Sequence, residues 1–295
     1  MIEARGLTKR YGAQVAVQGV SFRCEPGTVT GFLGPNGAGK STTLRMICGL
    51  TPRSAGEATV LGADYRQIAN PARHVGVMLD ASAQHGGRRG RETLRLCADT
   101  IGVEPGKVDE MLTLVGLDSR AAKRRVGKYS LGMRQRLGLA QVLLGEPDVL
   151  ILDEPANGLD PEGIIWMREL LRRFAADGGT VLLSSHLLNE VEVIADQLLL
   201  IKDGALVASG SKDELLAGTG TLVRSPEPES LRRALEAARI SVTAAEAGLI
   251  ADSDPESVGR AAHAGGVVLS ELRAADGAGL EQLFLSLTSG REDDQ

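Results

Sequence analysis

The stretch that most constrains the fold of this chain is Gly34–Ser41, which reads Gly-Pro-Asn-Gly-Ala-Gly-Lys-Ser. It fits the pattern G-x-x-x-x-G-K-[ST], in which glycines permit a tight turn and backbone N–H groups point at phosphate oxygens. A β-rich run at residues 29–33 precedes it, and residues 42–50 follow with apolar side chains at helical spacing. The order of strand, loop and helix therefore predicts a nucleotide phosphate site. The alternative is a glycine-rich turn that carries a lysine by chance.

Every residue of this loop, and the one after it, is a candidate ligand of the nucleotide. Lys40 supplies a cation for the β- and γ-phosphates, and the Ser41 hydroxyl is an oxygen ligand suited to Mg²⁺. The candidates are Gly34, Pro35, Asn36, Gly37, Ala38, Gly39, Lys40, Ser41 and Thr42.

Three ionisable side chains follow strands that are predicted to be buried. Residues 149–152 contain no polar residue, which is typical of a parallel strand covered on both faces, and Asp153 and Glu154 come next. His186 follows a similar run at residues 181–185. Because ligands of open α/β sheets bind beyond the carboxyl ends of the strands, we expect these side chains to face the phosphates. A structural or superficial role is the alternative for His186.

Length and composition limit the class of protein. The 295 residues suffice for a nucleotide domain and a second, small domain. No apolar run approaches the roughly 20 residues that a spanning helix needs, and the start of the chain lacks the layout of an export signal. We therefore expect a cytosolic protein that does not insert into the membrane. Cys24, Cys48 and Cys97 are far apart in the sequence, which favours reduced thiols over disulfides or a metal site.

The charge of the chain bears on its partners. A net charge of −5 argues against a polyanionic partner, and we expect no nucleic acid partner. Residues 88–91 and 123–125 are nevertheless local basic clusters, which we interpret as solvated surface.

The remaining patterns predict the order of elements. Short β-like runs over residues 2–61 indicate an antiparallel flap, and apolar positions at helical spacing between residues 81 and 128 indicate a helical insertion. Residues 198–208 read as a closing hairpin that ends the first domain near Gly218.

The last quarter of the chain has a different rhythm. Strands at residues 221–224, 240–243, 249–251 and 267–269 and two helices between them follow the order β-α-β-β-α-β of ferredoxin-like domains. A final helix is predicted from the apolar residues Leu280, Leu283, Phe284 and Leu287.

Together, the loop, the two acids and the histidine resemble the ATP-binding subunit of an ATP-binding-cassette (ABC) transporter over about residues 2–218. The segment that separates this family from other P-loop proteins is usually Leu-Ser-Gly-Gly-Gln, and residues 129–133 here read Tyr-Ser-Leu-Gly-Met. Ser130 and Gly132 match the pattern, whereas Leu131 and Met133 replace the first glycine and the glutamine. This form resembles the subfamily of exporters that handle antibiotics, peptides and similar cargo.

The resemblance implies roles in ATP hydrolysis. Lys40 and Ser41 hold phosphate and Mg²⁺, and Asp153 supports Mg²⁺, largely through water. Glu154 orients and deprotonates the attacking water, and His186 contacts the γ-phosphate.

The resemblance also implies roles in binding and assembly. Tyr11 stacks on adenine. The sequence pattern alone fits equally well a tyrosine that is half-buried in a strand and has no contact with the nucleotide. Ser130 and Gly132 complete the ATP site of the opposite subunit, and Asp160 links the two halves of a dimer.

One position departs from the family. A glutamine near the end of the strand at residues 75–79 usually contacts Mg²⁺ and senses the membrane partner, and this chain has Asp80 there and Gln84 four residues on. Asp80 can still bind Mg²⁺ or its water, and we retain it as a candidate ligand.

We therefore expect an α/β P-loop ATPase of the ABC type, with an antiparallel β subdomain, a helical subdomain at about residues 81–137 and an accessory α+β domain at 219–295. It is predicted to hydrolyse ATP with Mg²⁺ as a homodimer and to power an exporter through a separate membrane permease on the cytoplasmic face of the cell membrane. One alternative is a mechanical clamp on a membrane complex or nucleic acid. Another is an ATP-gated binding module with little turnover.

Overall fold

The structure is a computed structural model that describes residues 1–81, 83–216, 220–245, 248–275, 280 and 283–284. The chain forms two compact units, Met1–Lys212 and Asp213–Gln295, each of which is described by itself. The division falls N-terminal to the predicted boundary at Gly218, and the short helix α8 (Lys212–Leu216) begins there. In the described part of the chain, no helix has both the length and the apolar character needed to cross a membrane.

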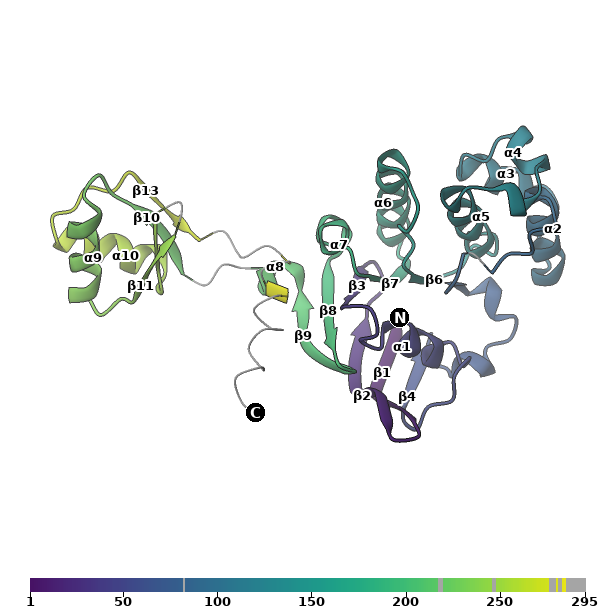
Figure 1. Cartoon of the computed structure of the whole chain (residues 1–295), viewed down its shortest axis with the longest axis horizontal. Helices are drawn as coiled ribbons and strands as arrows, with labels where there is room; N and C mark the ends of the chain where they lie inside the picture. Colours follow the sequence, from purple (N-terminus) through teal and green to yellow (C-terminus); the bar gives the residue numbers. More distant parts are fainter. Residues whose placement is uncertain (82, 217–219, 246–247, 276–279, 281–282, 285–295) are drawn as a thin grey trace. The chain divides into compact units, whose positions relative to one another are not determined.

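A six-stranded sheet forms the centre of the first unit (Figure 1). Five of its strands are parallel, and β9 pairs antiparallel with β8 in the hairpin expected from the sequence. The residues of β3 and β7 are all buried, as expected for strands covered on both faces. In spatial order the strands are β5 (Val75–Met78), β6 (Val149–Asp153), β7 (Thr180–Ser185), β3 (Val29–Leu33), β8 (Gln197–Lys202) and β9 (Ala205–Ser211).

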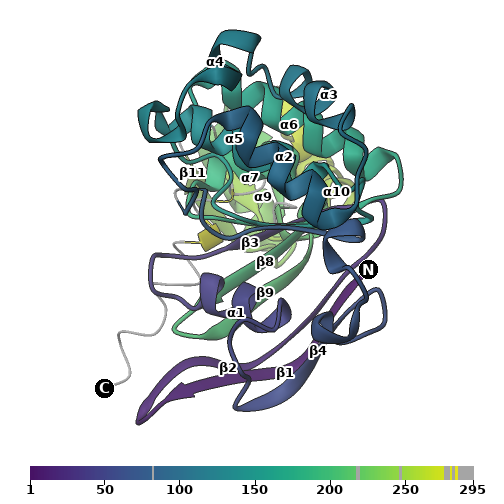
Figure 2. The ribbon, with the colours of Figure 1, turned by 90° about the vertical axis from the view of Figure 1, so that its right-hand side faces the viewer.

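A separate antiparallel sheet corresponds to the predicted flap. Its strands are β2 (Gln14–Cys24), β1 (Ile2–Tyr11) and β4 (Ala55–Val60), in that order. Helix α1 (Lys40–Ile47) lies between the two sheets (Figure 2). Phe22 of β2 and Phe32 of β3 pack with their ring centroids 5.8 Å apart in the core that joins them.

Four helices form the helical subdomain and share a core of their own (Figure 1). They are α2 (Gly90–Ile101), α3 (Lys107–Leu114), α4 (Ser119–Lys123) and α5 (Leu131–Leu143). Helix α5 extends beyond residue 137, where we expected the subdomain to end. Single 3-10 turns occur at Tyr65–Gln67, Pro71–Arg73 and Val126–Lys128.

Two further helices cover the sheet face opposite α1. They are α6 (Pro161–Ala176) and α7 (Leu188–Ile194). Helix α7 approaches β3 so closely that a Cβ on Gly31 would lie 2.2 Å from a methyl group of Val191. Glycine at position 31 therefore permits this packing.

The second unit has the predicted element order. Its sheet order is β11 (Val242–Ala245), β12 (Gly248–Ala251), β10 (Thr221–Arg224) and β13 (Glu271–Ala274), with every neighbouring pair antiparallel. Helices α9 (Pro228–Ala237) and α10 (Pro255–Ala264) share a core with this sheet.

The strand predicted at residues 267–269 is wrong, because the last described strand is β13. The Val267 N–H donates to the Ala262 carbonyl and closes the end of α10. Val267 and Leu269 are instead partly buried against the core outside any strand, which explains their apolar character. The predicted final helix falls mostly outside the described residues.

Candidate phosphate-binding and catalytic site

The loop after β3 has the backbone of a phosphate cradle. Gly37 and Gly39 have φ values of 86° and 106°, a region that L side chains rarely adopt. A Cβ on Gly39 would also lie 2.6 Å from the Ala16 carbonyl oxygen. Within the described part of the chain, the N–H groups of Gly37 and Gly39 donate to no protein acceptor. Such N–H groups before the first turn of α1 can bind an anion.

Lys40 is the first residue of α1 and is 5% exposed. Its Nζ donates to the carbonyl oxygens of Gly34 at 2.6 Å and Pro35 at 3.2 Å, and lies 3.7 Å from Glu154 Oε1. Burial lowers the pKa of Lys40 from its usual value, although Glu154 and Asp153 act in the opposite direction. A phosphate beside this ammonium would therefore favour its charged form.

Asp153, the last residue of β6, and Glu154, which follows it, are held by one serine of the neighbouring strand. Ser184 is the register partner of Asp153, and its hydroxyl donates to Asp153 Oδ1. The Glu154 N–H donates to both the carbonyl oxygen (3.2 Å) and the Oγ (3.1 Å) of Ser184. Glu154 has a φ of 50°, a conformation that costs about 1–3 kcal/mol in a residue other than glycine. Strain of this kind concentrates at functional sites.

His186 and Glu154 are in direct contact. His186 Nδ1 lies 2.8 Å from Glu154 Oε2, and the His186 backbone N–H donates to the same oxygen at 3.4 Å. The Glu154 carboxylate thus contacts His186 through one oxygen and Lys40 through the other. The sequence-predicted catalytic pair and the phosphate lysine therefore meet at one point.

Ser41 and Asp153 offer the ligands that Mg²⁺ prefers. Ser41 is exposed in the first turn of α1, and the Asp153 carboxylate accepts a hydrogen bond from the Ser184 hydroxyl. No cluster of three or more His, Cys, Asp or Glu residues in the described ranges suits a metal ion. The donor set fits an ion that takes its other ligands from phosphate and water, as Mg²⁺ does.

Asp80 and Gln84 lie differently from each other. Asp80 is exposed after β5, the neighbour of β6, so that it follows the same sheet edge as Asp153. Gln84 points at α5, because its Nε2 donates to the Arg134 carbonyl at 3.1 Å and to Gln141 Oε1 at 3.0 Å. Asp80, and not Gln84, therefore lies at the end of a strand that neighbours the strand carrying Asp153.

Residues 129–133, which read Tyr-Ser-Leu-Gly-Met, lead into helix α5. Ser130 is exposed and caps this helix, accepting a hydrogen bond from the Met133 N–H at 3.2 Å. Gly132 lies so close to the loop after β6 that a Cβ would approach the Gly158 carbonyl oxygen to 2.8 Å.

Gln135 is buried, and its Nε2 donates to the Glu154 carbonyl at 3.2 Å. Sequence reasoning missed the contacts of Ser184 and Gln135 with the acids. The one available signal for Ser184 was a polar residue at the end of a buried strand.

Asp160 and Tyr11 each have a structural partner. Asp160 caps α6 by accepting a hydrogen bond from the Gly163 N–H at 2.9 Å. Tyr11 ends β1, is 53% exposed, and has the Lys9 ammonium 4.7 Å from its ring centroid. The open part of this ring is available for stacking on a base.

This fold and site define the class of a P-loop ATPase. The family model described as "ABC transporter" matches residues 17–157, and the model of a domain of unknown function matches residues 219–281. The bacitracin transport ATP-binding protein BcrA of Bacillus licheniformis is 39% identical over 73% of this chain and 71% of its own length. The Nod factor export ATP-binding protein I of Burkholderia lata is 37% identical over 99% of this chain and 97% of its own length.

A solved structure agrees in fold. It is the dimeric structure of a post-hydrolysis state of an ATP-binding cassette bound to ADP and Pi, with a TM-score of 0.65 over 72% of this chain and 99% of that chain at 21% identity. The chain belongs to the ABC transporter family, as an ATP-binding protein. The predicted fold class and the predicted ATPase subunit of an ABC exporter are thereby confirmed.

Proposed function

We propose that the chain hydrolyses ATP as a homodimer, with Glu154 as the general base. The observation that carries this proposal is the meeting of Glu154, Lys40 and His186 at the phosphate loop. In the reaction, the water oxygen bonds to the γ-phosphorus, a water proton moves to the Glu154 carboxylate, and the bond to the β–γ bridging oxygen breaks, which releases ADP. Lys40, His186 and the loop N–H groups stabilise the negative charge that spreads over the phosphoryl oxygens.

Ser41 and Asp153 would hold Mg²⁺, with Asp80 as a further candidate. When bound, the ion neutralises phosphate charge and fixes the phosphates in place. Ser184 supports this role by orienting the Asp153 carboxylate.

The dimer is proposed because one chain carries one set of motifs. Ser130 is exposed at the start of α5, where it can reach a nucleotide bound to a second copy. Because Gly132 has no side chain, the start of α5 can pack close to the backbone of Gly158. Asp160 at the start of α6 is proposed to contact the second copy, and Tyr11 to stack on the adenine.

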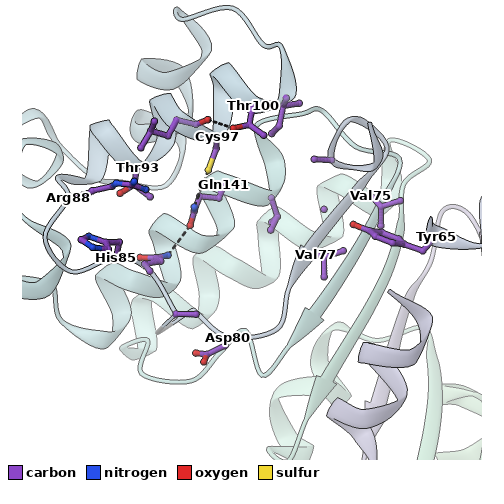
Figure 3. Close-up of a pocket in the computed structure, with 17 residues that line it drawn as sticks. Tyr65, Val75, Val77, Asp80, His85, Arg88, Thr93, Cys97, Thr100 and Gln141 are labelled. Atoms are coloured by element: carbon purple, nitrogen blue, oxygen red, sulfur yellow. Dashed lines mark hydrogen bonds between the residues drawn. The ribbon is translucent and has the colours of Figure 1, made fainter. Parts of the chain in front are cut away.

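A membrane permease is proposed to dock in a groove between the sheet and the helical subdomain. This cavity of about 650 Å³ is lined by β5, by α2 and by residues of α5 (Figure 3). Asp80 lines this groove and follows β5, the strand next to β6, which ends in Asp153. We propose that movement of a docked segment reaches the ATP site through Asp80, and that the chain works on the cytoplasmic face of the membrane, where it binds the permease.

The cargo class follows from the relatives. Two of the relatives are named for bacitracin transport and Nod factor export, and we propose that this chain serves export of a comparable antibiotic, peptide or amphiphile. The cargo contacts themselves belong to the membrane permease.

The groove is tested by co-purification with a membrane subunit encoded by a neighbouring reading frame. Thr100→Trp fills the groove at an exposed position, and Leu114→Trp, on α3 outside the groove, is the matched control. We expect the groove variant to lose about tenfold or more in affinity for the membrane subunit, while its own ATP hydrolysis stays unchanged. Equal binding by both variants would count against this docking site, and a nuclease or ribosome factor as the only partner would favour the clamp.

A further inference from the structure

Two basic segments that the ATP site does not use lie side by side in the helical subdomain. Residues 88–95 and 120–128 together hold nine lysines and arginines and one acid, Glu92. An antiparallel bridge pairs Arg89 with Arg125, and backbone hydrogen bonds on both sides of it hold the segments together. We call the surface formed by residues 88–95 and 120–128 the basic patch. It concentrates positive charge in a chain whose net charge is −5.

Nearly all cations of the basic patch lack an acidic partner. Arg91, which pairs with Asp109, is its one side chain in an ion pair among the residues that the structure describes. Arginines elsewhere in the chain do have such partners, as in the pairs Arg53–Asp64 and Arg168–Glu190. Like charges crowded on a surface repel one another and destabilise the fold unless an anion binds.

A hollow of about 430 Å³ lies within this patch. Arginine forks bind phosphate oxygens in pairs, and a lysine adds a point charge, so two arginines and a lysine without an acidic partner among the described residues, beside the paired Arg91, suit a phosphate group. The hollow is lined by Arg89, Arg91, Glu92, Arg95, Ala122 and Lys123.

The position of the patch suggests where the phosphate comes from. Arg88 lines the groove in which the membrane permease is proposed to dock (Figure 3). The next residue, Arg89, lines the hollow. We propose that the basic patch binds the headgroup phosphates of acidic phospholipids at the membrane surface. The choice of a lipid rests on the proposed function, whereas the anion site rests on the charges and the hollow alone.

The composition of the patch favours lipid over single-stranded nucleic acid. Base stacking needs exposed aromatic rings. Tyr129, the aromatic residue next to the patch, is buried, and its hydroxyl donates to the Ala121 carbonyl at 2.7 Å. Clusters of four to eight lysines and arginines held near a membrane surface bind acidic lipids through charge alone.

The test is sedimentation of the full-length chain with vesicles of phosphatidylglycerol and phosphatidylcholine, or of phosphatidylcholine alone. The patch variant combines Arg89→Gln, Arg95→Gln, Lys123→Gln and Arg125→Gln. We expect the wild-type chain to bind the acidic vesicles and to be released by salt. The patch variant should bind them at least about 100-fold more weakly, since each cation near an acidic surface contributes separately.

The control variant removes the same number of exposed cations outside the patch: Arg45, Arg173, Arg233 and Arg239, each changed to Gln. We expect it to bind acidic vesicles within about threefold of wild type. Inorganic phosphate at millimolar concentration should compete poorly if a membrane surface is the ligand. Equal losses in the two variants, or complete displacement by free phosphate, would overturn the lipid assignment.

Failure of the wild-type chain to bind acidic vesicles would also overturn the lipid assignment. Binding of an acidic peptide or RNA through the same residues would then assign the patch to that partner. Vesicle binding is measured without the membrane subunit, and ATP hydrolysis is measured in parallel. A chain that hydrolyses ATP but ignores vesicles contradicts the lipid proposal alone. A chain that binds vesicles through the patch but does not hydrolyse ATP contradicts the proposed function alone.

Discussion

Lys40 and Glu154 form an ion pair, with Nζ 3.7 Å from Oε1, although they lie in different elements far apart in the sequence. Burial lowers the pKa of Lys40 from its usual value, and the Glu154 carboxylate opposes this shift. The same carboxylate contacts His186 through its other oxygen. The phosphate-binding cation and the histidine thus contact opposite oxygens of the proposed base.

Lys40→Ala is expected to abolish tight ATP binding. The change removes the ammonium of the phosphate loop together with its hydrogen bonds to the Gly34 and Pro35 carbonyls. Charge-assisted contacts to phosphate are the strong ones, so we expect a loss of about 100-fold or more in affinity. Titration with a fluorescent ATP analogue measures this loss, with exposed Lys128→Ala as the control. An affinity within about threefold of wild type would count against the assignment.

Ser184→Ala is expected to weaken hydrolysis through Asp153 and Glu154. The variant loses the hydroxyl that donates to Asp153 and accepts from the Glu154 N–H. Loss of a group that orients a metal ligand typically costs roughly 10–100-fold in metal affinity or activity. ATPase rates over a range of Mg²⁺ concentrations should show a raised requirement for Mg²⁺, which Ser184→Thr should largely restore. An unchanged requirement would mean that Ser184 serves folding alone.

The three thiols should differ in reactivity. Burial raises the pKa of Cys24 and Cys48 to about 12, so at pH 8 only roughly one in 10⁴ of either is a thiolate. Cys97 is partly exposed and lines the docking groove. Ellman's reagent should therefore modify one thiol rapidly in the native chain, and Cys97→Ser should remove this phase. Rapid reaction of two thiols would contradict the packing described for the first unit.

The second unit is expected to affect assembly or rate but not ATP binding. Every residue assigned to ATP lies in Met1–Lys212, which is compact by itself. A chain ending at Leu216 should bind ATP within about threefold of the full-length chain. Light scattering and ATPase assays then report altered dimerisation or turnover. A folded truncation that cannot bind ATP would rule the idea out.

The sequence was sufficient where function depends on contiguous residues or on the ends of strands. Gly34–Ser41 specifies its own backbone, and the parallel strands place Asp153, Glu154 and His186 at one edge of the sheet. For these residues, the place in the sequence, within the loop or at the carboxyl end of a strand, was enough to predict the place in the site.

Contacts between distant segments were beyond the sequence patterns. Ser184 reaches Asp153 because of the register between β6 and β7, and Gln135 reaches Glu154 through the packing of α5. The pairing of Arg89 with Arg125 depends on loop geometry in the same way. At Val267, apolar character suggested a strand, whereas the residue is needed to close α10.

Glu154→Gln tests the central claim most directly, because it keeps the shape of the base and removes its charge. The variant should still bind ATP but hydrolyse it about 10²–10⁴-fold more slowly, the usual contribution of a positioned general base. ATP that is bound but not hydrolysed should then hold two copies together. Light scattering with ATP and Mg²⁺ should therefore show a stable dimer of Glu154→Gln and only a transient dimer of wild type. Hydrolysis at the wild-type rate, or a variant that binds ATP and remains monomeric, would contradict the account.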